Sequence, residues 1–125
     1  MKAFTDISQS KKLAEILPIE SADMHYSKDF DGSWFVDLAK YTSVKIPKYV
    51  GNIEEHLLPC WSLGALLDAL PTKLQIVLAI NDYQGDRKEK YVIGSVEHDK
   101  YDCFADNPID ACYEMIIKLY EQNIL

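Results

Sequence analysis

The strongest hydrophobic pattern in the chain lies between two prolines, over residues 59–71, where nearly every side chain is apolar. Ser62 is suited to cap a helix there, because its hydroxyl can accept a hydrogen bond from a backbone N–H of the first turn. Trp61 precedes it and can pack on Leu66 as a hydrophobic staple. Asp68 is the only charged residue before the second proline ends the helix. We therefore expect most of this helix to face protein.

Two further helices are predicted near the ends of the chain. Asp6 and Gln9 have the spacing of a capping pair, and apolar positions follow them at helical spacing, so a helix is expected over about residues 7–17. Near the C-terminus, Asn107 can cap a helix whose first position is a proline, a residue whose φ already suits a helix. This last helix is expected over about residues 108–122.

The middle of the chain has the alternation typical of strands. Residues 24–26 and 34–38 flank a turn-like segment and predict an irregular hairpin. Residues 74–80 are apolar on both faces and predict an inner strand, which pairs antiparallel with residues 91–96 across a polar loop. Between residues 41 and 59 the pattern assigns only an extended piece at Val44–Ile46 and a loop around Gly51 and Asn52.

These elements place helices mainly at the ends and strands in the middle. The sequence therefore predicts an α+β fold, with a small antiparallel sheet and about three helices packed on one face. At 125 residues, the chain is expected to form a single domain over residues 1–125, without help from disulfides or metal.

The predicted terminal helix has a wider apolar surface than one contact needs. One arc would seat the helix on the sheet, and it contains Ile109, Cys112, Met115, Ile116 and Leu119. A second strip adjoins it, which we call the terminal strip, and it contains Tyr113, Ile117, Tyr120 and Ile124. Since exposed apolar surface of this kind is normally covered by protein, the terminal strip is the predicted partner-binding site.

Composition and charge exclude several classes of partner. The net charge is −7, and the acidic excess is larger in residues 63–125, with eleven acids and six bases, than in residues 1–62, with nine acids and seven bases. Basic residues are scattered, whereas nucleic acids and anionic membranes require a basic track. We expect no direct contact with nucleic acid and none with a membrane. The N-terminal residues do not resemble a signal peptide, and no apolar run is long enough to span a bilayer.

The cysteines favour a reducing compartment. Cys60, Cys103 and Cys112 are an odd number with irregular spacing, which is typical of buried thiols in cytoplasmic proteins. No two Cys or His residues have the close spacing of zinc ligands, so neither a metal site nor a cofactor is predicted. Cys60 and Cys112 are expected in the core. Cys103 lies in a polar segment and is expected to be the exposed thiol.

A cluster of acids is the densest charged feature of the chain, and it comprises Glu97, Asp99, Asp102, Asp106 and Asp110. It lacks the alternating oxygen ligands and central glycine of an EF-hand loop, so a solvated loop followed by a helix cap is favoured. The alternative is a site for acid–base chemistry or a divalent cation, with His98 nearby. Phosphate-binding glycine loops and the serine nucleophile motif of α/β hydrolases do not occur.

Several segments resemble a group of small uncharacterised proteins from phages and integrated mobile elements of Bacteroides-type bacteria. The segments that resemble it are Leu13–Pro18, Ala22–Met24, Leu58–Leu67 and Asn107–Ala111, together with Glu114 and Leu119. Residues 28–56 depart most from the pattern. The resemblance implies an accessory protein of a mobile element that acts in the host cytoplasm, and it implies no catalytic residues.

Two functions follow from these observations. The first is non-enzymatic protein–protein interaction. The partner is either another protein or a second copy of the chain, and in the second case the complex is a homodimer. It rests on the wide apolar surface of the terminal helix and on the missing catalytic motifs. The second is a small hydrolase or metal-dependent enzyme that uses Cys103 or the acids near Asp99 and Asp102, which requires these side chains to converge in one pocket.

Overall fold

The computed structural model describes residues 2–40, 56–82 and 85–125. The extended piece expected at residues 44–46 and the loop near residue 51 lie outside these ranges. The chain forms two compact units, one from Phe4–Ala65 and the other from Leu66–Leu125 together with Met1–Ala3. The expectation of a single domain over residues 1–125 stays a prediction.

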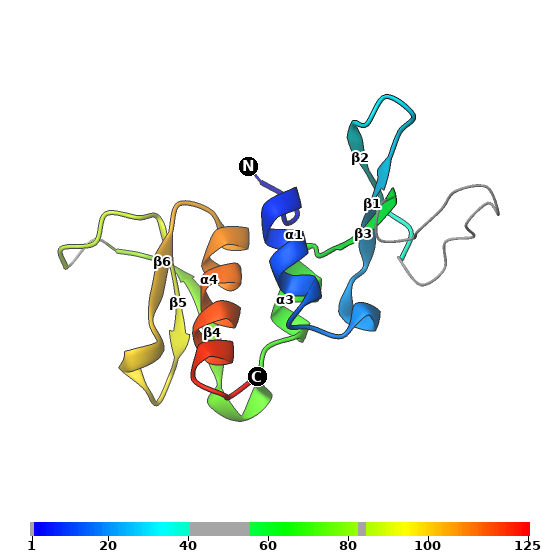
Figure 1. Ribbon diagram of the computed structural model, residues 1–125. Helices are drawn as coiled ribbons and strands as arrows, with labels where there is room; N and C mark the ends of the chain where they lie inside the picture. Colours follow the sequence, from blue (N-terminus) through cyan, green and yellow to red (C-terminus); the bar gives the residue numbers. More distant parts are fainter. Residues whose placement is uncertain (1, 41–55, 83–84) are drawn as a thin grey trace. The chain divides into compact units, whose positions relative to one another are not determined.

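The first unit is built on a three-stranded antiparallel sheet in the order β2-β1-β3 (Figure 1). Its elements are α1 (Ile7–Ala14), β1 (Met24–Lys28), β2 (Trp34–Asp37), β3 (Leu57–Cys60) and the start of α3 (Leu63–Asp68). The hairpin predicted from residues 24–38 is confirmed. Helix α1 packs beside β3.

Local side-chain chemistry sets the helix boundaries in this unit. Asp6 accepts a hydrogen bond from the Gln9 amide at 2.8 Å, and the Gln9 side chain accepts one from the Asp6 amide at 3.1 Å, which confirms the predicted cap. Helix α1 ends at Ala14, three residues before the predicted end. A residue that precedes proline avoids the helical region, so the chain leaves the helix ahead of Pro18.

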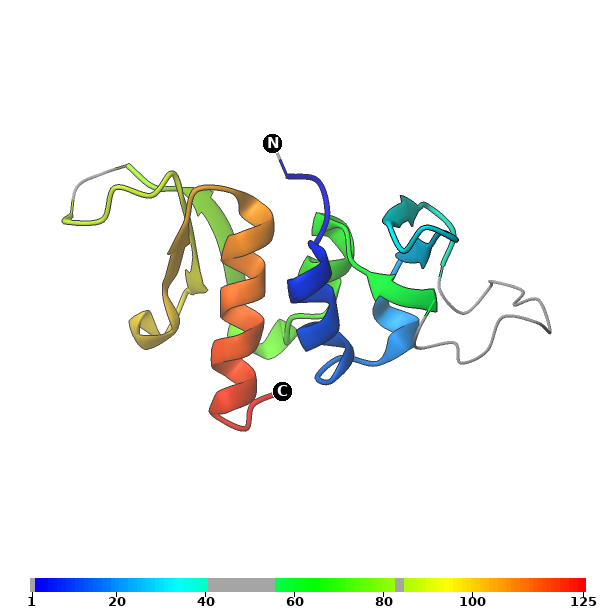
Figure 2. The same cartoon turned by 45° about the horizontal axis from the view of Figure 1, so that its top comes forward.

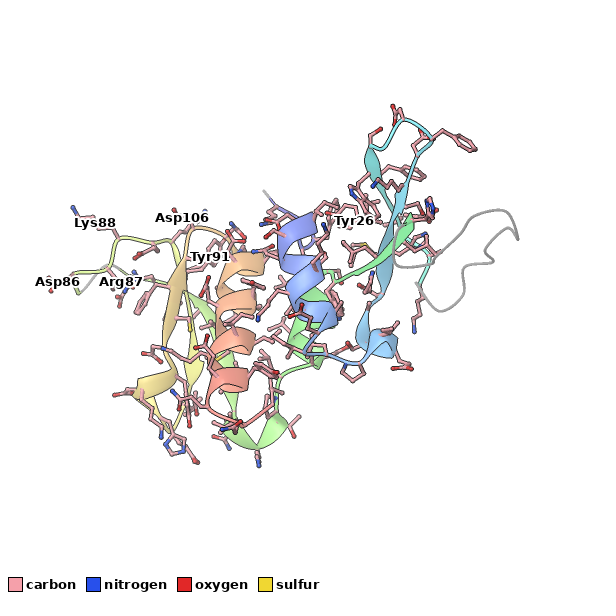
Figure 3. All side chains as sticks on the ribbon, viewed as in Figure 1. Tyr26, Asp86, Arg87, Lys88, Tyr91 and Asp106 are labelled. Carbon is pink, nitrogen blue, oxygen red and sulfur yellow. The ribbon has the colours of Figure 1, made fainter. Side chains whose placement is uncertain are left out.

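A buried polar cluster joins the N-terminal segment to the sheet. Thr5 is fully buried, and its hydroxyl lies 2.7 Å from the Ser10 hydroxyl and accepts from the Trp61 amide at 3.2 Å. The Tyr26 hydroxyl, at the end of a side chain that projects from β1, donates to the Thr5 carbonyl at 2.7 Å (Figure 3). Burial, with a smaller contribution from Cys60, raises the pKa of Tyr26. Because buried polar groups need partners, this cluster fixes one arrangement of the core.

The capped helix predicted after Trp61 is confirmed as α3, although it ends at Asp68 and not directly before Pro71. The Ser62 hydroxyl accepts from the Ala65 amide at 3.3 Å and donates to the carboxylate of Asp23. Leu66 is fully buried, as predicted, but Leu67 is 39% exposed. The helix is therefore less enclosed than its sequence indicated.

The second unit holds another three-stranded antiparallel sheet, in the order β4-β5-β6, with α4 on one face (Figure 2). Its elements are β4 (Ile76–Ile80), β5 (Tyr91–Ser95), β6 (Cys103–Ala105) and α4 (Pro108–Glu121). The side chain of Asn107 accepts from the Asp110 amide at 2.9 Å, which confirms the predicted cap. Helix α4 contacts β5 and β6.

The α+β class is confirmed, although the described residues form two small antiparallel sheets in place of one. Two strand assignments need correction. β4 is an edge strand and not an inner one, because among the described residues it pairs only with β5. β6 lies in the segment expected to be a solvated loop. Within the described ranges, no helix combines the length and apolar character needed to cross a membrane.

Candidate functional site

The predicted partner-binding residues lie on α4 and just beyond its C-terminal end, in the second unit. Tyr120 is 43% exposed, whereas Tyr113, Ile117 and Ile124 are half-buried. The residues predicted to seat the helix are all buried, and these are Ile109, Cys112, Met115, Ile116 and Leu119. The sequence thus separated the buried arc of α4 from the terminal strip. Whether the terminal strip binds a partner stays a prediction.

Polar contacts hold α4 in its place beside the sheet. Lys2 lies 2.9 Å from the carboxylate of Asp110 in the first turn, where a negative charge also favours the helix dipole. Farther along the helix, the Lys118 ammonium group donates to the backbone carbonyl of Asp102 at 3.2 Å. These contacts orient the helix. Tyr120 lies near its C-terminal end.

The expectation that Cys103 is the exposed thiol is wrong. Cys103 lies on β6 beside Ile93 of β5, is only 8% exposed, and donates to the Tyr101 carbonyl at 3.4 Å. Burial is the largest cause that raises its pKa, Glu114 and Asp102 add to the rise, and Lys118 opposes it. A thiol with a raised pKa is a poor nucleophile at neutral pH. The polar sequence around Cys103 hid the short strand that buries it.

The other two cysteines are buried, as expected. Burial raises the pKa of Cys60, and it raises the pKa of Cys112 from 9.0 to about 12. All three thiols are free. Since the thiolate is the reactive form, none of these environments activates a cysteine.

We expect the three thiols of the native protein to react with a disulfide reagent such as DTNB at least about ten-fold more slowly than those of the unfolded chain. Buried thiols with raised pKa must wait for an opening of the structure before they react. Absorbance of the released thiolate measures the rate with and without denaturant. Fast labelling of Cys103 in the native protein would contradict its buried position.

The acidic segment forms no compact group of ligands. Asp102 lies against Gly94 on the sheet face opposite Ile93, and its carboxylate occupies the space that a Cβ at Gly94 would need. Burial is the first cause that raises the pKa of Asp102, and the charge of Asp99 is the second. Among the described residues, no three His, Cys, Asp or Glu side chains are placed to hold a metal ion. His98 is exposed and packs edge-on to Tyr101.

The loop between β4 and β5 is organised by Asn81 and Arg87. The buried Asn81 side chain donates to the Arg87 and Glu89 carbonyls at 3.0 and 2.9 Å. The side chain of Arg87 lies in this loop (Figure 3). Its guanidinium donates to both carboxylate oxygens of Glu89, at 3.1 and 2.8 Å, and covers the Phe104 ring. The ion pair lowers the pKa of Glu89. Because Glu89 balances the charge of Arg87, this loop does not present a free anion-binding arginine.

Two exposed apolar features were not identified from the sequence as candidate sites. Phe30 is 99% exposed at the tip of the β1–β2 hairpin, where Asp29 and Ser33 close the turn with a backbone hydrogen bond of 2.8 Å. On β4, Val77 is 50% and Ile80 is 68% exposed. The periodicity of these segments was visible in the sequence, but periodicity does not show which strand lies at the edge of a sheet.

Comparisons of the chain with protein-family models, with curated proteins and with solved structures found no match.

Proposed function

We propose that this protein acts by non-enzymatic contact with another protein, as an accessory protein of a phage or mobile element in the cytoplasm of its host. The observation that carries the proposal is the exposure of Tyr120 at the end of a helix that is already seated by other residues. Its side chain combines a large apolar ring with a polar tip, a combination that is common at protein interfaces.

The neighbouring residues extend this surface. Ile117 precedes Tyr120 by one helical turn and is also partly exposed, so the two side chains lie on the same side of α4. Tyr113 continues the strip toward the N-terminus of the helix. A partner helix or strand laid along this side would meet apolar side chains throughout.

The cysteine chemistry supports the same proposal. The enzymatic alternative requires an activated thiol or paired carboxylates in one pocket. Burial raises the pKa of Cys103, and Asp102 lies against Gly94 on the opposite face of the strand pair from that thiol. No observation in the described residues favours the enzymatic alternative.

The double variant Ile117→Lys, Tyr120→Lys tests the proposal. We expect it to lose a partner that the wild type retains from host-cell lysate, because two charges would be buried at the contact. The circular-dichroism spectrum and the oligomeric mass should stay unchanged. Affinity capture measures the retained partner, and light scattering measures the mass.

A matched control is the variant Glu114→Gln, Glu121→Gln, which raises the net charge by the same amount on the exposed face of α4. It should keep both the partner and the mass. If the strip variant behaves like this control, the terminal strip is not an interface. If the strip variant unfolds, the strip belongs to the core of the monomer, and the proposal is wrong.

A further inference from the structure

Within the described ranges, no strand pairs with the outer edge of β4, which therefore presents open backbone groups. Asn81 donates to the Lys90 carbonyl at 2.7 Å, and Val96 donates to the Gln75 carbonyl at 3.2 Å. Bonding alternates along an antiparallel pair, so in the register of β4 and β5 the odd-numbered residues of β4 direct their N–H and C=O groups toward β5. The N–H and C=O groups of Ile76, Leu78 and Ile80 therefore point to the open edge.

The other edges of the two sheets carry features that discourage pairing. β3 contains Pro59, which has no N–H to donate. β2 has only four residues and ends on Asp37, and β6 has only three, between Asp102 and Asp106. Short strands, charges and proline are the common means by which sheet edges avoid other chains. β4 has five residues and none of these protections.

The side chains of β4 are open as well. Ile80 is 68% and Val77 is 50% exposed, and they lie on opposite faces of the strand. An added strand would cover both. An apolar edge with accessible side chains on both faces is the arrangement that accepts another strand by main-chain pairing.

We propose that β4 pairs antiparallel with β4 of a second copy of this chain, about a twofold axis at Leu78. Leu78 would then hydrogen-bond to Leu78 of the second copy, and Ile76 to its Ile80, and all of these residues have backbone groups that point to the open edge. This inference goes beyond the proposed function, because it concerns a different surface from the terminal strip.

Charge favours the second copy in this orientation. Two chains of net charge −7 repel each other, so their contact requires a surface without acids, and β4 has no charged residue. Lys73 precedes the strand and Asp82 follows it. Antiparallel pairing brings Lys73 of one copy close to Asp82 of the other at one end of the paired strands. The twofold axis places the same two opposite charges together at the other end. Parallel pairing would place like charges together.

The first test is the mass in solution. We expect the full chain to show twice its mass of 14.3 kDa by light scattering, and to fall two-fold in mass on dilution or in the variant Ile80→Lys. The control Val96→Lys replaces a valine of similar exposure, 64%, that lies just after β5 and not on β4, and it should remain a dimer. A monomeric wild type, a dimeric Ile80→Lys variant or a larger assembly would each overturn the proposal.

Amide hydrogen exchange tests the same pairing without a substitution. Raising the protein concentration should slow exchange at Leu78 and Ile80, whose N–H groups point to the open edge. Exchange at Val77 and Ala79 should be slow at every concentration, since their N–H groups already bond to β5. Equal concentration dependence at all four amides, or none, would overturn the proposal. The α4 strip variants should keep this pattern, which separates failure of the proposed function from failure of this inference.

Discussion

Replacing Trp61 with alanine should lower the free energy of unfolding by about 3–5 kcal/mol. The side chain is fully buried, so its removal leaves a large cavity. Its Nε1–H donates to the Ser21 hydroxyl at 2.9 Å, and that hydroxyl would lose a partner as well. Urea denaturation followed by circular dichroism measures the change.

Trp34 provides the matched control, because it is the other tryptophan of the chain and is only half-buried on β2. The ammonium group of Lys28 lies 5.5 Å from the centre of its ring. Trp34→Ala should lower the free energy of unfolding clearly less than Trp61→Ala does, since solvent already reaches part of the Trp34 ring. Equal unfolding midpoints for Trp61→Ala and the wild type would show that Trp61 is not a core residue.

Alkaline pH should destabilise the protein through Cys112. Burial raises the pKa of this thiol from 9.0 to about 12, so between these values the unfolded chain loses the proton while the folded chain keeps it. Ionisation of the unfolded chain then favours unfolding, and stability falls as pH rises from 9 to about 12. At about 1.4 kcal/mol per pH unit, the total loss is on the order of 4 kcal/mol. Below pH 9 the thiol is protonated in both states and contributes no pH dependence.

Cys112→Ala removes this ionisation and should flatten the dependence of stability on pH above 9. Some dependence should remain, because burial also raises the pKa of Cys60, Cys103 and Tyr26. Denaturant titrations at a series of pH values give the slope of stability against pH for the wild type and for Cys112→Ala. Identical slopes for Cys112→Ala and the wild type would mean that this thiol ionises as easily in the folded state as in the unfolded state.

The elements with strong local signals could be predicted from the sequence. The capping residues Asp6, Ser62 and Asn107 all perform their expected role, because a cap depends on a few neighbouring atoms. The buried arc of α4 followed from helical periodicity. Both hairpins followed from short apolar segments that flank polar turns.

The missed features depend on contacts far along the chain. β3 has a proline in its middle, and a strand with a proline is recognisable only when its edge position is known. β6 has three residues amid acids, too few for a periodic signal. For the candidate site, the sequence located the terminal strip but misplaced Cys103 and overlooked the edge of β4. The error for Cys103 comes from the shortness of β6, and the error for β4 comes from strand order, which local patterns do not specify.

The chain segments that form each of the two units set an order for folding during synthesis. The sheet β2-β1-β3 and α1 all come from one continuous segment, Phe4–Ala65, so their contacts can form once that segment has left the ribosome. The other unit uses both ends of the chain, since Lys2 pairs with Asp110 at the start of α4. Helix α4 leaves the ribosome after the three strands that it covers. Until α4 has emerged, the apolar face of β4-β5-β6 must therefore stay exposed, and the nascent chain is most vulnerable to aggregation at that stage.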